Sequence, residues 1–125
     1  MQAIVLAAAG GPEFGPLCQV SSKAMIPFLG QPLLARVIQW LERHDARAIT
    51  VSLRQRPYPI ESYFHKHPPA QARLAFQLDH ERVGTAGAVK KAVSAARGTV
   101  VVAQGALVTN LDLEAAFAAH KAKGA

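Results

Sequence analysis

The sequence is poor in cysteine, in acidic residues and in long apolar runs. Its single cysteine, Cys18, excludes an intrachain disulfide, which suits a reducing compartment. The apolar run from Ala3 to Ala9 is far too short to span a bilayer, and no basic segment of the signal-peptide kind precedes it. We therefore expect a soluble, cytoplasmic protein with no membrane partner.

The shortage of acidic residues leaves a strong positive balance, with 14 Lys and Arg against 8 Asp and Glu and a net charge of +6. Such a balance favours anionic partners, from small phosphates to nucleic acid. The basic residues are scattered along the chain, and aromatic residues do not alternate with them. We therefore expect no nucleic-acid partner and keep a nucleic-acid-binding module only as a third hypothesis.

The length and composition suit one globular domain. The chain has 125 residues, of which 50% are hydrophobic and 18% are charged. That is enough to bury a core without disulfides or a structural metal. Five histidines are present without metal-ligand spacing, so we predict no histidine metal site. Residues 1–125 are predicted to form a single domain.

Strand and helix patterns alternate along the chain. The run from Ala3 to Ala8 stops at glycines and a proline, which is typical of a strand buried on both faces. A long loop is expected over residues 10–28, and Pro32 is expected to open the first helix. The expected strands are 3–8, 48–53, 74–78 and 99–103, and the other expected helices lie near 60–64, 86–96 and 112–123.

Four strands alternating with helices predict an α/β fold, with a mostly parallel sheet and helices on both faces. Ligands of such sheets bind beyond the carboxyl ends of the strands. The chemistry-bearing segments are therefore sought in the loops that follow the strands.

Three of these segments have both a functional and a structural interpretation. The glycines of the loop from Leu6 to Gly15 let backbone N–H groups approach an anion, although the loop matches neither common nucleotide fingerprint. Lys23 is a phosphate ligand or an ordinary surface lysine. The segment from Val83 to Ala88 is a glycine-rich turn into a helix, which Thr85 can cap, and it either attracts an anion or only packs tightly.

In their order and spacing, five segments resemble the N-terminal, nucleotide-binding half of the sugar-phosphate nucleotidyltransferases (the NTP-transferase domain). These enzymes join a nucleoside triphosphate to a sugar 1-phosphate. The resemblance implies a three-layer, Rossmann-like nucleotidyltransferase fold. It rests on Met1–Ala8, on Pro16–Leu34 with its Lys23, Met25, Pro27 and Gly30, on Ile60–Phe64, on Gly84–Val89 and on Leu111–Leu113.

The resemblance also implies roles for particular residues. Lys23 would approach the phosphates as the retained catalytic residue, and Mg²⁺ would offset their charge. The partner would be a nucleoside triphosphate or a nucleotide sugar. The implied nucleotide-binding residues are Leu6, Ala7, Ala8 and Gly11 along the nucleotide, with Asp79, Gly84 and Thr85 toward the base.

Two departures from the family pattern fall on its chemistry. Glu13 stands where the family has the arginine that holds the leaving pyrophosphate, and Ala106 stands where it has a magnesium-binding aspartate. A methyl group cannot coordinate a hard cation, so the magnesium site is expected to be lost. The chain is also expected to be truncated, because it stops before the family's sugar-binding half.

We therefore expect a catalytically impaired, nucleotide-binding or regulatory module with an open sheet edge, which would form a homo-oligomer or bind a protein partner. The alternative is an active transferase, or a fragment of one, that uses substitute residues.

Overall fold

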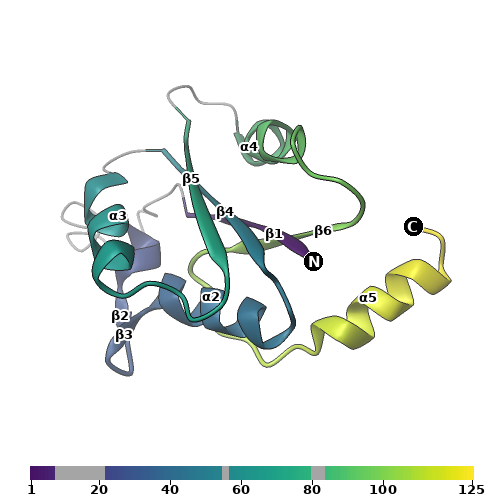
Figure 1. The fold of residues 1–125 in the computed structure, drawn as a ribbon, viewed down its shortest axis with the longest axis horizontal. Helices are drawn as coiled ribbons and strands as arrows, with labels where there is room; N and C mark the ends of the chain where they lie inside the picture. The colour runs from purple at the N-terminus through teal and green to yellow at the C-terminus, as the bar shows by residue number, and fades with distance from the viewer. Residues whose placement is uncertain (8–21, 55–56, 80–83) are drawn as a thin grey trace.

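The chain forms a four-stranded parallel sheet in the order β5-β4-β1-β6 (Figure 1). A computed structural model describes residues 1–7, 22–54, 57–79 and 84–125. The strands are β1 (Gln2–Leu6), β4 (Ala48–Leu53), β5 (Arg73–Leu78) and β6 (Val100–Gln104). All four lie where the apolar runs predict them, to within two residues at either end.

Helices cover both faces of this sheet. Helices α2 and α3 lie on one face and α4 on the other, while α5 extends away from the sheet (Figure 1). The expected three-layer α/β architecture is therefore confirmed. The helices are α2 (Leu33–Arg43), α3 (Pro57–Lys66), α4 (Gly84–Val93) and α5 (Leu113–Ala122).

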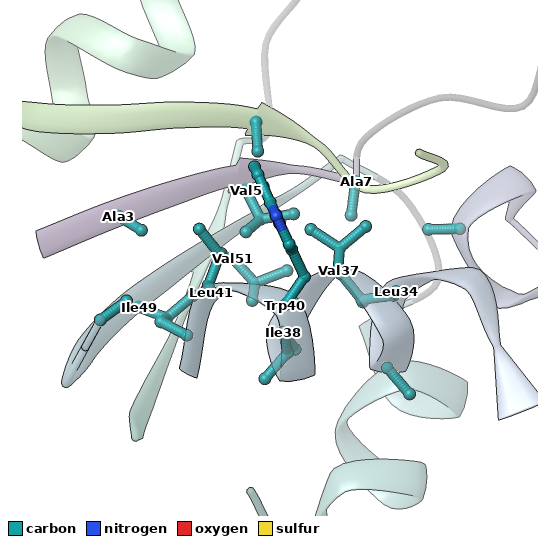
Figure 2. Close-up of a cluster of buried hydrophobic side chains, with 14 of the residues drawn as sticks. Ala3, Val5, Ala7, Leu34, Val37, Ile38, Trp40, Leu41, Ile49 and Val51 are labelled. Atoms are coloured by element: carbon teal, nitrogen blue, oxygen red, sulfur yellow. The ribbon is translucent and has the colours of Figure 1, made fainter. Parts of the chain in front are cut away.

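The core lies between α2 and the central strands. The apolar residues of α2 recur at helical spacing and point toward β1 and β4, where residues such as Val5 and Val51 are fully buried (Figure 2). Trp40 is buried on the same helix, and its indole N–H donates to the carbonyl of Leu111 at 2.9 Å. This bond ties the segment between β6 and α5 to the core.

The described part of the expected loop over residues 10–28 contains short regular elements. A 3₁₀ helix, η2 (Lys23–Met25), is followed by two short antiparallel strands, β2 (Pro27–Phe28) and β3 (Gln31–Pro32). The turn between these strands is closed by Leu29 and Gly30, both at positive φ. Sequence analysis missed the turn because the long apolar side chain of Leu29 seldom adopts that conformation.

All four helices begin one to three residues from the expected positions, α3 with the largest difference at Pro57. Pro32 ends β3 and is the N-cap of α2, so the helix begins one residue later than predicted. Helix α4 already begins at Gly84, two residues before the first residue expected in it. In the parts of the chain that the structure describes, no helix is long and apolar enough to cross a membrane.

Candidate functional site

One row of residues crosses the sheet where its strands end. Leu6 at the end of β1 pairs with Ser52 of β4 on one side and with Gln104 of β6 on the other. Ser52 in turn pairs with Gln77 of β5. Ala7 and Asp79, two of the residues expected to carry function, follow this row at the ends of β1 and β5. They therefore lie at the carboxyl ends of the strands, where ligands of such sheets bind.

The ends of β1 and β6 are in direct contact at this edge. The amide of Gly105 donates to the carbonyl of Leu6 at 2.8 Å. A Cβ atom at position 105 would lie 3.1 Å from the Ala7 Cβ and 3.1 Å from the Leu6 oxygen. Only glycine fits there without a shift of the backbone. The contact places Ala106, which is partly buried, immediately beyond the end of β1.

Asp79 follows β5 and is held by groups from three elements. Its side chain is almost wholly buried, since the residue is 3% exposed. Ser52 of β4 donates its hydroxyl to Oδ2 at 2.8 Å, and the Lys91 ammonium of α4 donates to Oδ1 at 3.1 Å. The Gln77 amide donates to both oxygens, at 3.2 and 3.3 Å. The carboxylate is thus bonded entirely within the chain.

Burial and hydrogen bonding act on this carboxyl in opposite directions. Burial alone would raise the pKa of Asp79. Hydrogen bonds from Ser52, Lys91 and Gln77, together with the positive charge of Lys91, outweigh burial and hold the pKa of Asp79 below its ordinary value. Asp79 is therefore an anion at neutral pH, although water hardly reaches it.

The first turn of α4 carries the next two expected residues. Gly84 opens the helix at φ +68°, a conformation that residues with a side chain rarely adopt, and nothing lies within 4 Å of a Cβ built there. Thr85 is the second residue of the helix, so the expectation that it caps the helix is wrong. Both residues are exposed, as a ligand-binding helix start requires.

Lys23 lies on a different element. It begins η2, which packs on α2, and it is partly buried, whereas the following residue, Ala24, is buried in the core. The assigned residues Ala8 and Gly11, and the replaced position Glu13, lie outside the described residues.

Sequence analysis missed Ser52 and Lys91, which complete the surroundings of Asp79. A signal existed for Ser52, because a hydroxyl in an otherwise buried apolar strand needs a hydrogen-bond partner. No sequence pattern links Lys91 to Asp79, since the two are joined only by the packing of α4 on β5.

At the ends of β1 and β6, the described residues beyond the paired row carry no carboxylate that could bind a magnesium ion. The end of β6 offers Gly105 and Ala106, neither of which has a side-chain oxygen, and the end of β1 offers Leu6 and Ala7. Within the described ranges, no group of three or more His, Cys, Asp and Glu side chains could hold a metal. Mg²⁺ prefers oxygen ligands in a near-octahedral arrangement.

The sheet defines the class of this protein, an α/β domain whose strand order reverses at β1. In this class, ligands generally bind where the strand order reverses. A family model described as "Nucleotidyl transferase" matches residues 2–125. The chain therefore belongs to the nucleotidyl transferase family, as the resemblance implied.

Relatives and solved structures agree with this family. The chain is 30% identical over 137 aligned positions to a UTP–glucose-1-phosphate uridylyltransferase of Synechocystis, covering 100% of this chain and 35% of the relative. It is 29% identical to a bifunctional protein GlmU of Methanococcus maripaludis, covering 97% of this chain and 30% of that protein. The chain thus spans about a third of the length of these curated relatives.

A crystal structure of HddC from Yersinia pseudotuberculosis has the same fold. It superposes with a TM-score of 0.86 at 24% identity, over 95% of this chain and 53% of HddC. HddC has also been crystallised in complex with GMP-PN.

Proposed function

We propose that this chain is a nucleotide-binding module of the nucleotidyl transferase family whose magnesium-dependent transfer is impaired, and that it acts by binding a nucleotide or a partner. The observation that carries the proposal is Ala106. It follows Gly105, whose contacts with Leu6 and Ala7 fix the exit of β6 against β1. A methyl group therefore occupies the position that the family resemblance gives to a metal-binding carboxylate.

The charge at position 13 supports the same proposal. The resemblance assigns that position to an arginine that holds pyrophosphate, and this chain has Glu13. A carboxylate beside a triphosphate repels it, at a cost of roughly several kcal/mol at close range in a site of reduced dielectric. Transfer in this family depends mostly on positioning and charge stabilisation, so these two replacements act on its main contributions.

Two features of the described residues support nucleotide binding. The carboxyl ends of four parallel strands meet at one edge, and α4 starts there with exposed Gly84 and Thr85. Free N–H groups at a helix start favour anions and polar base edges. We propose that these groups, with Leu6 and Ala7, bind the nucleotide, while Lys23 approaches its phosphates.

The second candidate is an active transferase that uses substitute residues. The retained Lys23 and the retained start of α4 favour it, and the relatives include a uridylyltransferase. Such an enzyme would have to obtain its metal ligand and its sugar-binding surface from residues other than Ala106 and the edge described above.

Calorimetry with the four nucleoside triphosphates, with and without Mg²⁺, tests the proposal. We expect weak binding that Mg²⁺ does not tighten. Binding tightened by Mg²⁺, or magnesium-dependent release of pyrophosphate when a sugar 1-phosphate is added, would establish the second candidate instead. If no nucleotide produces a heat of binding, nucleotide binding is contradicted. A protein partner then remains as the proposed ligand.

A gain-of-function variant sharpens this experiment. Ala106→Asp should make nucleotide binding depend on Mg²⁺, because it restores an oxygen ligand beside the end of β1. Ala106→Asn is the matched control, since it has nearly the same shape without the charge. An equal response of the two variants would contradict the role given to position 106.

A further inference from the structure

Most of the hydrogen-bonding capacity of the Asp79 carboxylate is used within the protein. An ionised carboxylate has about four lone-pair positions for hydrogen bonds. Three groups donate to it, Ser52, Lys91 and Gln77, and because the Gln77 amide is shared between both oxygens they make four contacts of 2.8 to 3.3 Å. With the residue 3% exposed, little of its surface remains for a ligand. Asp79 is therefore poorly suited to contact a base directly.

The same network anchors α4 at two further points. The Lys91 ammonium also donates to the carbonyl of Leu78 at 3.2 Å, so it bonds both residues at the end of β5. The Gln77 amide also donates to the carbonyl of Ala88 at 3.2 Å. Ala88 is itself buried, 5% exposed. Charge and packing thus hold the helix to the strand end.

These anchors lie on the helix face that contains the first residue of α4. Gly84, Ala88 and Lys91 are spaced by four and three residues, the spacing of neighbours along one face. Fixing Ala88 and Lys91 therefore also fixes where Gly84 and the free amides of the first turn lie relative to the sheet.

We propose that Asp79 is a positioning residue rather than a base-reading one: through Lys91, Ser52 and Gln77 it sets the place of the first turn of α4, and the amides of that turn contact the ligand. This inference rests on the proposed nucleotide binding. It also predicts that base selectivity does not depend on the Asp79 carboxylate.

Three variants of adjacent lysines test the proposal in the whole chain. Lys91→Met removes the donor to Asp79, Lys91→Arg keeps a cation, and Lys90→Met is the matched control on an exposed neighbour. Affinities for the four nucleoside triphosphates are measured for each by calorimetry. We expect Lys91→Met to weaken all four by a similar factor, roughly tenfold. Lys91→Arg should restore most of the loss, and Lys90→Met should match the parent chain.

Asp79→Asn separates positioning from base reading. If Asp79 is a positioning residue, this variant should lower the affinity for all four nucleotides by the same factor. The ratios of the four affinities then stay constant. A change in those ratios, with Lys91→Met leaving affinity unaltered, would overturn the proposal and make Asp79 a contact to the base.

Hydrogen exchange without nucleotide gives a second readout. The amides of residues 85–88 should exchange faster in Lys91→Met than in the parent chain, and at the parent rate in Lys90→Met. Unchanged exchange in Lys91→Met would overturn the proposal whatever the nucleotides do. Faster exchange in a chain that binds no nucleotide would refute the proposed function and, with it, the ligand-positioning role, while still supporting the anchoring of α4.

Discussion

At the scale of single residues, Asp79 and Gly105 show how the edge of the sheet is built. Asp79 remains charged in a buried position because Ser52, Gln77 and Lys91 replace the water it has lost. Gly105 lets two strand ends approach so closely that a methyl group would collide with Ala7. Asp79 therefore makes the stability of the protein depend on pH, and Gly105 makes the stability sensitive to the addition of a methyl group.

The pKa of Asp79 gives a pH dependence with a definite sign. A folded pKa below the unfolded value, about 3.9, means that Asp79 contributes stability above that pH and loses it as the pH falls through the folded pKa. Urea unfolding between pH 2 and 7 should therefore show a free energy of unfolding that falls below about pH 4. The fall should be smaller in Asp79→Asn, and equal slopes in the two proteins would contradict the assignment.

Gly105→Ala should destabilise the protein. The new Cβ would lie 3.1 Å from the Ala7 Cβ and the Leu6 carbonyl oxygen, and the backbone atom cannot move aside cheaply. Overpacking of this kind costs about 1–3 kcal/mol, measured as the shift of the urea midpoint. Gln104→Ala, at the exposed neighbouring position, is the control and should change the free energy of unfolding by less than about 0.5 kcal/mol.

At the scale of elements, α5 differs from α2, α3 and α4 because it does not cover a face of the sheet (Figure 1). Of its residues, Leu113 alone is buried, and the helix extends away from the sheet (Figure 1). Its start is held by Asp112, whose carboxylate accepts from the amides of Glu114 and Ala115 at 3.0 and 3.2 Å. Local capping therefore contributes more to this helix than tertiary packing does.

Asp112→Ala should destabilise α5 while leaving the rest of the fold in place. Loss of the cap costs about 1 kcal/mol of helix stability, and little core packing is present to compensate. Hydrogen exchange should rise for the amides of residues 114–118, with the urea midpoint almost unchanged. Asp112→Ser keeps a capping oxygen, so its amides should exchange at the rates of the parent chain. A large shift of the urea midpoint in Asp112→Ala would contradict the prediction and show that α5 unfolds together with the core.

At the scale of the whole molecule, large apolar side chains are exposed on β6 and in the segment that follows it. Strand β6 is an edge of the described sheet, and Val102, Val108 and Leu111 on and after it are 46%, 62% and 54% exposed. Open edges and apolar patches favour association. We propose that Val102, Val108 and Leu111 contribute to the contact with a second copy of the chain or with a protein partner.

Sedimentation over a range of protein concentrations should detect self-association. A charge on the edge strand opposes strand pairing, so Val102→Lys should shift the chain toward monomer. Leu29→Lys places the same charge on a more exposed apolar residue, 78% exposed, in the turn between β2 and β3, and should leave association unchanged. A monomer at every concentration, in the parent chain and both variants, would rule out the homo-oligomer.

The sequence by itself determined the order of strands and helices, the α/β class and the family. These follow from signals that lie close together in the chain: the apolar run of β1, the helical spacing of Leu34, Val37 and Leu41 in α2, and the ordered motifs of the resemblance. It also indicated Asp79, Gly84 and Gly105–Ala106 as positions of interest.

Only the tertiary structure decided what those positions contact. Asp79 meets Ser52 and Lys91 because β4, β5 and α4 pack together, and Gly105 meets Leu6 because β6 returns to lie beside β1. These partners lie on different elements that are brought together only by folding. A local sequence periodicity therefore cannot predict that they contact each other. The turn at Leu29, whose positive φ is unusual for leucine, also depends on tertiary structure, because Arg36 of α2 donates to the carbonyls of Phe28 and Leu29.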